Sequence, residues 1–265
     1  MTPVQLSIFD LVTASVLVLL DAGISIALGL RLHRQLLLAA ARMVVQLMLV
    51  GFVLRAVFAM GSAPATVAVV ALMIAAAARE VATRPGQRLR SGGNYRIGGI
   101  VVGVSGIATV LLALLTAIRP APWYDPRYAI PLMGIVLGSV LNSASLCLDT
   151  FFSGVTNGRA AIEARLALGA TRHQALGPLM RESIRKGLIP IANQMSAAGI
   201  ITLPGIMTGQ ILAGMDPLDA VKYQILLMFL LAGGSGLAAV GTVYLASSAV
   251  TDDRDRLRLD RLTAC

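Results

Sequence analysis

Residues 129–152 read AIPLMGIVLGSVLNSASLCLDTFF, and this stretch decides the fold class. Its one charged residue, Asp149, lies near its end, and its apolar side chains occur in runs rather than in strict alternation. About 20 apolar residues are enough to cross the roughly 30 Å hydrocarbon core of a bilayer as an α-helix. The stretch therefore predicts a membrane-spanning helix.

Six further apolar segments accompany this one, and together they predict an all-α transmembrane bundle of about seven spans in one domain, residues 1–265. Hydrophobic residues make up 57% of the chain and charged residues 13%, against about 25% charged residues in an ordinary soluble domain. Most of the surface is therefore expected to face lipid. The predicted spans are Leu6–Leu30, Leu36–Met60, Pro64–Thr83, Ile97–Ile118, Ala129–Phe152, Leu188–Gly214 and Tyr223–Ser248.

Arginine and lysine are distributed unequally between the two sides of the predicted bundle. If the N-terminus lies outside, 17 of the 22 Lys and Arg residues fall on the inner side and three on the outer side. Basic residues mark the cytosolic side of a membrane protein, so we expect an external N-terminus and a cytosolic C-terminus. The same bias explains the net charge of +9 without a nucleic-acid partner.

Two polar segments lie on the predicted cytosolic side. The longer one, Ser153–Gly187, is amphipathic, and Gly169 and the pair Gly177-Pro178 are expected to break it into short helices. The C-terminal segment, Thr251–Cys265, alternates acidic and basic residues and is expected to be a solvated helical end, to which the sequence assigns no function.

The string EARLALG, residues 163–169, resembles the EAA-x3-G motif of ABC permeases. In that family the motif forms a coupling helix that docks into a cleft of the ATPase subunit. The following Ala and Thr complete an LGAT string that is similar to coupling segments of exporter-type permeases. The resemblance implies ATPase-coupling roles for Glu163, Ala164, Gly169, Ala170 and Thr171. Arg165 replaces the second Ala of the motif, and the downstream Ile-x-Leu-Pro portion is absent, so an interfacial helix on the inner leaflet is the alternative.

Longer strings extend the resemblance over about residues 10–248. They are RMVVQLMLVG at 42–51, WYDPRY at 123–128, PLMGIVLGSVLNSASLCLD at 131–149 and LPGIMTGQILAGMDP at 203–217. They are similar to the Fet-type iron-export ABC permeases of bacteria, a family with plant relatives tied to aluminium tolerance. The resemblance implies a homodimeric, multi-pass permease of the bacterial inner membrane that exports iron or another metal cation. The alternatives are an organic cargo such as a nucleotide sugar, a motorless carrier or channel, and a signalling or assembly module without cargo.

The chain lacks the sequence of an ATP-driven motor. A Walker A loop needs a Gly-Lys pair followed by Ser or Thr, because its lysine contacts phosphate. The two lysines of the chain, Lys186 and Lys222, are followed by Gly187 and Tyr223. We therefore expect ATP and Mg²⁺ on a separate ATPase subunit, and no cofactor or enzymatic activity on this chain.

Charged residues within the predicted spans are candidates for the transport pathway, because they are costly in lipid. Asp21 and Arg42 lie at similar depths in the first two spans, and we expect them to pair, with Gln46 one turn further on. The pair could serve as a structural ion pair or as a gate or substrate contact.

The fifth predicted span has a polar face. Asn142, Ser145 and Asp149 share one side of the helix. In lipid, such a face turns toward a neighbouring helix or a pathway. It predicts either hydrogen bonds between helices or an oxygen-lined entrance for a hard cation.

The sixth predicted span contains Pro204-Gly205, which is expected to kink or unwind it. Freed carbonyl groups beside Met207 and Gln210 are then candidates to line a pathway. The other methionines are scattered, and His33 and His173 form no metal-ligand pair, so no tight metal site is expected.

Overall fold

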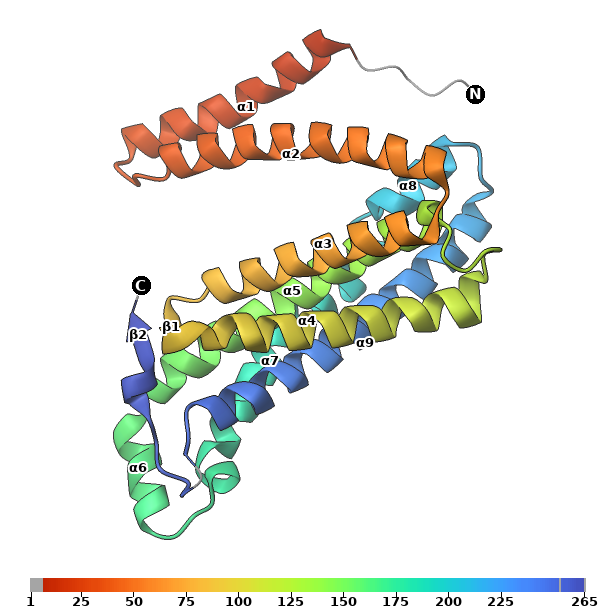
Figure 1. Ribbon diagram of the computed structural model, residues 1–265. Helices are drawn as coiled ribbons and strands as arrows, with labels where there is room; N and C mark the ends of the chain where they lie inside the picture. Colours follow the sequence, from red (N-terminus) through yellow and green to blue (C-terminus); the bar gives the residue numbers. More distant parts are fainter. Residues whose placement is uncertain (1–6, 253, 265) are drawn as a thin grey trace. The chain divides into compact units, whose positions relative to one another are not determined.

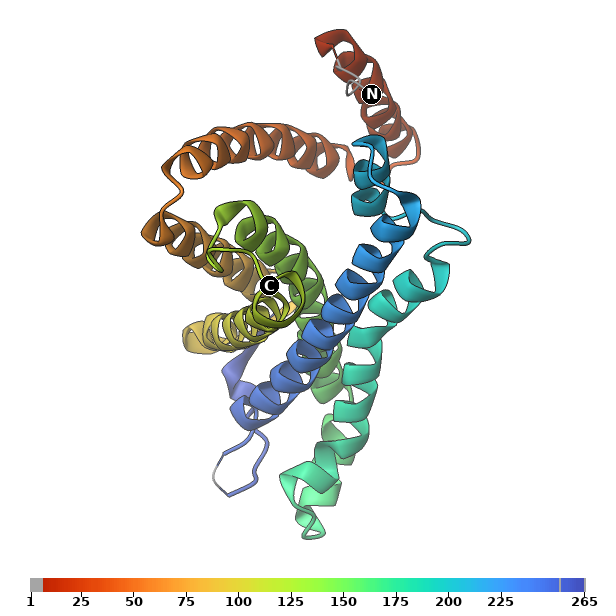
Figure 2. The same cartoon turned by 90° about the vertical axis from the view of Figure 1, so that its right-hand side faces the viewer.

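The computed structural model describes residues 7–252 and 254–264, and over this part of the chain it confirms an all-α membrane bundle (Figures 1 and 2). The helices are α1 (Ile8–Ala27), α2 (His33–Met60), α3 (Ala63–Thr83), α4 (Gly93–Leu112), α5 (Pro126–Asn157), α6 (Arg159–Ala167), α7 (Arg172–Ala197), α8 (Gly205–Leu212) and α9 (Pro217–Ala249). The short elements are β1 (Gln87–Leu89), η1 (Arg90–Gly92), η2 (Ala113–Ile118), η3 (Leu259–Arg261) and β2 (Leu262–Ala264). The chain divides into two compact units, which are described separately: α1 and α2 with residues 212–214, and the remainder from residue 62 onward.

The first unit is a helical hairpin of α1 and α2. Ser7 and Asp10 form a capping box at the start of α1, in which the Ser7 N–H donates to the Asp10 carboxylate at 2.8 Å. In the connection to α2, Gly29 has a left-handed φ of +65°, and the Leu32 N–H donates to Ser25 Oγ at 3.0 Å. Most of the large apolar side chains on both helices are exposed, so this hairpin needs lipid or another protein chain to cover it.

α5 is the central helix of the second unit. Figures 1 and 2 show α4, α7 and α9 running alongside it. The side chains of Leu148, Phe151 and Phe152 are fully buried, and Ser139 of α5 shares a 2.7 Å hydrogen bond with Ser235 of α9. Lipid tails are as apolar as the buried side chains, so close packing and interhelical hydrogen bonds hold these helices together.

Glycine allows the closest contact between α5 and α7. A Cβ atom added to Gly187 would overlap the sulfur of Cys147, and one added to Gly154 would overlap the side chain of Leu179. The Cys147 thiol also donates to the backbone oxygen of Ser183 at 3.3 Å. Two small residues on the facing helices therefore let α7 lie directly on the central helix.

Six of the described helical segments are long and apolar enough to cross a membrane: α1, α2, α3, α4 continued by η2, α5 and α9. They match six of the predicted spans, although the predicted start of the first, Leu6, lies outside the described residues. The predicted span Leu188–Gly214 is wrong as one continuous helix, because residues 198–204 separate α7 from α8. This gap confirms the predicted interruption at Pro204-Gly205. The number of crossings, the orientation and the single-domain organisation stay predictions.

The polar segment Ser153–Gly187 folds only partly as expected. Gly169 has a φ of +89° between α6 and α7, which confirms the break predicted there. The break predicted at Gly177-Pro178 is wrong, because both residues lie inside α7. Gly177 has no Cβ to collide with the proline ring, and the missing N–H of Pro178 leaves one backbone carbonyl unpaired without ending the helix.

The prediction of a helical C-terminal end is wrong for residues 251–252 and 254–264. Thr251 and Leu257 form an isolated antiparallel bridge, and β2 pairs antiparallel with β1. Figure 1 shows this small sheet at the same end of the second unit as α6. Cys265 lies outside the described residues.

Candidate functional site

The predicted coupling residues gather around the turn between α6 and α7. Glu163 is held on α6 by a 2.9 Å ion pair with Arg159, one helical turn earlier. Thr171 is the N-cap of α7, where its side chain and that of Gln174 form a capping box. Gly169 supplies the left-handed residue between these helices. Local hydrogen bonds and one glycine therefore fix the shape of this turn.

Four of the five predicted coupling residues line one groove. The groove has a volume of about 520 Å³, and its lining includes Glu163, Gly169, Ala170 and Thr171. Ala164 is exposed on α6 and does not line the groove. The opposite side of the groove comes from residues 254–257 of the C-terminal tail, which the sequence does not connect with this turn.

Leu168 lies next to this groove, and reasoning from the sequence missed it. Its side chain is 88% exposed at the C-cap of α6. It lies in the turn between α6 and α7, outside the six helical segments that are long and apolar enough to cross a membrane. Its exposure could have been predicted from its position directly before Gly169, which ends the helix, because no further turn of helix follows to cover the leucine.

The polar face of α5 binds the connection between α3 and β1. Arg84 Nη1 donates to Asn142 Oδ1 at 3.0 Å, and the Gly86 N–H donates to Asp149 Oδ1 at 3.0 Å. One further step of seven residues along α5, Thr156 Oγ1 donates to the side chain of Gln87 at 2.7 Å. These bonds support the reading of Asn142 and Asp149 as structural hydrogen-bonding groups.

Ser145 has a different environment on the same helix. Its side chain is buried, and its Oγ has no hydrogen-bond partner among the described residues. The structure thus gives Asn142 and Asp149 structural partners and leaves the role of Ser145 open. A direct contact of any of the three with cargo stays a prediction.

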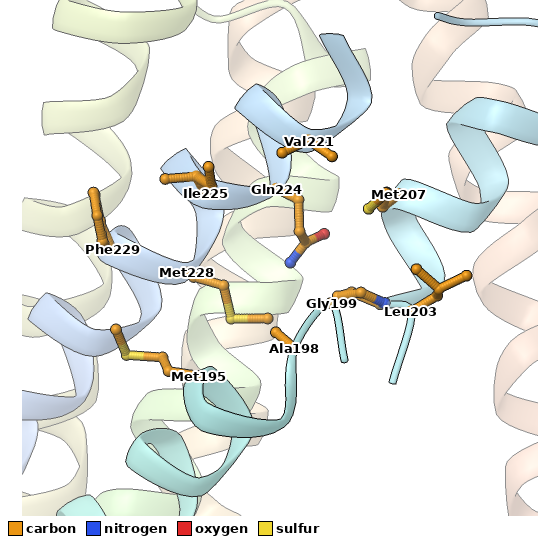
Figure 3. Close-up of a pocket in the computed structure, with 11 residues that line it drawn as sticks. Met195, Ala198, Gly199, Leu203, Met207, Val221, Gln224, Ile225, Met228 and Phe229 are labelled. Carbon is orange, nitrogen blue, oxygen red and sulfur yellow. The ribbon is translucent and has the colours of Figure 1, made fainter. Parts of the chain in front are cut away.

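A pocket of about 560 Å³ lies where the helix is interrupted, between the end of α7, the start of α8 and the first turns of α9. Figure 3 shows the thioether side chains of Met195, Met207 and Met228 around it. Met207 was predicted from the Pro204-Gly205 break, and the structure places it in the lining. The full lining is Met195, Ala198, Gly199, Leu203, Pro204, Met207, Val221, Gln224, Ile225, Met228 and Phe229.

Gln224 is the polar side chain of this pocket, and the sequence reasoning missed it. It is 7% exposed, its Oε1 has no hydrogen-bond partner among the described residues, and Figure 3 shows its amide pointing into the pocket. A buried amide without a partner carries a free-energy cost of about 1–3 kcal/mol, which a ligand could offset. Gln210 is on α8 outside the lining, and its Oε1 is also buried without a partner in the described part of the chain.

The remaining predicted residues lie on the α1–α2 hairpin. Asp21 is on α1, and Arg42 and Gln46 are on α2, all with exposed side chains. Their expected pairing and their roles in transport stay predictions.

Comparison with known proteins gives the family. The model of the Uncharacterised protein family (UPF0014) matches residues 8–250. The chain belongs to the UPF0014 family. It is a multi-pass membrane protein, in keeping with the expected inner-membrane location.

UPF0014 relatives come from bacteria and plants. The chain is 41% identical over 229 residues to the UPF0014 membrane protein slr1647 of Synechocystis, covering 84% of this chain and 88% of the relative. It is 32% identical to the probable iron export permease protein FetB of Escherichia coli, covering 96% and 95%. It is 33% identical to the UPF0014 membrane protein STAR2 of rice, covering 88% and 80%. No solved structure gives a significant match.

The UPF0014 match separates the two sides of the groove. Glu163, the turn at Gly169 and the pocket around Gln224 lie inside the matched region, and the tail from Thr251 lies beyond it. Among the residues that the structure describes, no group of three or more His, Cys, Asp or Glu side chains could hold a metal ion.

Proposed function

We propose that this chain is the membrane-spanning permease subunit of an ABC transporter in the bacterial inner membrane, working as a homodimer and driven by a separate ATPase. The observation that carries the proposal is the near full-length match to FetB, a probable iron export permease protein. The proposed direction of transport is out of the cytosol.

The turn between α6 and α7 is the proposed docking site for the ATPase. Leu168, 88% exposed outside the candidate spans, suits an apolar pocket on a protein partner. The capping box at Thr171 and the left-handed Gly169 preorganise the turn, which lowers the entropy lost on docking. In this assembly, ATP and Mg²⁺ bind to the ATPase and not to this chain.

The proposed cargo is a metal cation, with iron favoured by the name of FetB. The pocket offers neutral ligands, namely the sulfurs of Met195, Met207 and Met228 and the amide oxygen of Gln224. Neutral ligands attract a cation less strongly than carboxylates do, and a transport site must release its ion as readily as it binds it. The pocket therefore suits transient passage better than storage. Its thioethers suit a soft ion such as Cu(I) better than iron, so the choice of iron rests on the likeness to FetB alone. The other proposed pathway residues are Asp21, Arg42, Gln46, Asn142, Ser145, Asp149 and Gln210.

One observation favours a second candidate cargo. The lining of the pocket is mainly apolar, which also suits an organic solute that presents one hydrogen-bonding group to Gln224. In that case the permease architecture stays the same and the cargo changes.

The test is elemental analysis of iron-loaded cells that lack this chain. The cells are complemented with the wild type or with the double variant Glu163→Ala/Gly169→Trp, each expressed beside the candidate ATPase. We expect lower cell iron with the wild type and not with the variant, because a bulky side chain strains the left-handed backbone at Gly169. If the wild type changes the content of no metal, the metal cargo is excluded and organic solutes are tested next.

A further inference from the structure

The C-terminal tail, residues 251–252 and 254–264, is folded by hydrogen bonds of its own. The Asp252 carboxylate accepts from the backbone N–H groups of Arg254 at 3.0 Å and Arg256 at 2.8 Å. The guanidinium of Arg256 also donates to this carboxylate at 2.9 Å. These bonds close a tight hairpin and fix the direction in which residues 254–256 face.

The tail is also anchored to the helical bundle. Arg261 Nη1 donates to the backbone oxygens of Ala249 at 3.0 Å and Thr251 at 3.3 Å. Thr263 Oγ1 donates to the Arg88 oxygen at 3.2 Å, beside the pairing of β2 with β1. Three apolar side chains of the tail pack against the core: Leu257, Leu259 and Leu262. The tail is therefore a structured part of this end of the bundle.

This folded tail forms the second wall of the groove beside the coupling turn. Leu166, Ala167 and four of the coupling residues, all except Ala164, line one wall, and Arg254, Asp255, Arg256 and Leu257 line the other. Since the family match ends at residue 250, this wall is an addition beyond the matched region. It brings the guanidinium groups of Arg254 and Arg256 and the carboxylate of Asp255 to the groove. Arg256 is paired with Asp252, so exposed Arg254, which has no ion pair among the described residues, is the guanidinium left to bind an acidic group of a partner.

We propose that the tail is part of the ATPase-docking surface, and that it binds an acidic patch next to the ATPase pocket that receives Leu168. This inference rests on the proposed function, because it assigns a second contact to the same partner. An ATPase is the occupant that fits, because the groove adjoins an 88% exposed leucine on a turn outside the candidate spans. Charge complementarity then adds specificity and speeds association.

The experiment measures the affinity of the full chain, in lipid nanodiscs, for the purified candidate stand-alone ATPase. The test variants are Arg254→Glu and Arg254→Glu/Arg256→Glu. The single variant keeps the Asp252 turn, to which Arg254 contributes its backbone N–H. The control is Arg258→Glu, because Arg258 pairs with Asp260 and does not line the groove. Leu168→Asp is the reference for loss of the turn.

We expect Arg254→Glu to weaken ATPase binding about tenfold at low salt, with a smaller effect at high salt because surface charges are screened. The double variant weakens binding further, and Arg258→Glu stays within about twofold of the wild type. Circular dichroism and thermal unfolding of each variant confirm that the fold is kept.

The outcomes separate the two proposals. If Leu168→Asp loses the ATPase while both tail variants bind like the wild type, the tail inference is overturned and the proposed function stands. If the tail variants bind the ATPase normally but lose affinity for vesicles of anionic lipid, the tail is a lipid contact and the inference is again overturned. If the wild type does not bind the ATPase, both proposals fail.

Discussion

The two ends of α7 differ in almost every physical respect. At its start, Thr171 and Gln174 form a capping box beside an exposed turn and a groove with charged walls. At its end, Met195 borders an apolar pocket in which the buried amide of Gln224 has no partner among the described residues. Thr171 and Gln174 at the start of α7 bond to each other, whereas the Gln224 amide at its end has no partner among the described residues and is free to bind a ligand.

This difference indicates that one helix joins two kinds of recognition. The start of α7 presents a preorganised surface with one exposed apolar side chain, that of Leu168, as protein interfaces do. The end presents a cavity with one convergent polar group, as small-ligand sites do. In the proposed transporter, the first meets the ATPase and the second meets the cargo, and α7 runs between them without a break.

The largest expected effect comes from the start of α7. We expect Leu168 to be a hot spot of the interface, so Leu168→Asp should weaken ATPase binding by about 30-fold or more, since a hot spot is worth about 2 kcal/mol or more. ATPase affinity and ATP-dependent export are the measurements. The control is Ala161→Asp, which places the same charge at an exposed position of α6 away from the groove. Equal losses in both variants would show that added charge, and not the leucine contact, matters.

The second-largest expected effect is a loss of stability caused by a substitution in the middle of α7. Gly187→Ala should destabilise the protein at the lower end of about 1–3 kcal/mol, because the new methyl group overlaps the sulfur of Cys147. The better helix propensity of alanine offsets part of that cost. Thermal unfolding in detergent measures it. Gly233→Ala is the matched control, since nothing lies within 4 Å of a Cβ added there, and it should unfold at the same or a higher temperature.

At the end of α7, stability and transport should change in opposite directions. Gln224→Leu removes a buried unpaired amide, so unfolding should cost about 1 kcal/mol more while export falls. Thermal unfolding and metal efflux are measured on the same preparations. Gln194→Leu is the control, because Gln194 is exposed on α7 outside the pocket lining. Unchanged efflux by Gln224→Leu would remove the pocket from the pathway.

The smallest effect concerns pH at the tail. The hydrogen bond from Arg258 lowers the pKa of Asp260 from 3.8 to about 2. The lowered pKa of Asp260 contributes stability that is present above the unfolded pKa and is lost as pH falls through about 2, so Asp260 should keep its charge between pH 5 and 8. ATPase affinity should therefore be constant over this range apart from changes in the ATPase itself. If ATPase affinity changed with pH in the wild type but not in Asp260→Asn, Asp260 would be titrating in this range, which would contradict its lowered pKa.

The sequence predicts the helices well where the signal is local. Long apolar runs are enough to predict α5 and α9, and the left-handed conformation of Gly169 follows from its lack of a side chain. Pro178 misleads, because whether a proline ends a helix depends on the residue before it and on the packing around it. The tail misleads for another reason. Its fold depends on pairing with β1, far away in the chain, which local charge alternation does not reveal.

The residues of the candidate site also differ in whether the sequence alone predicts them. The turn around Gly169 is readable because its chemistry lies in one short string. Leu168 and Gln224 are ordinary residue types, and their interest comes from exposure in one case and burial in the other. Asn142 and Asp149 are readable as a polar face, but their partners, Arg84 and Gly86, become visible only when the helices are packed.

The contact of Gly187 with Cys147 has a mechanical consequence. Gly187 lies about 22 Å along α7 from Arg172 and about 15 Å from Ala197, at 1.5 Å per residue. If this contact is a pivot, and α7 moves as one piece despite its internal Pro178 and Pro190, then α7 is a lever with unequal arms. A push on the coupling turn would then reach the pocket reversed in direction and reduced to about two-thirds of its size. Met195, about 12 Å along α7 from Gly187, would then move about half as far as the turn.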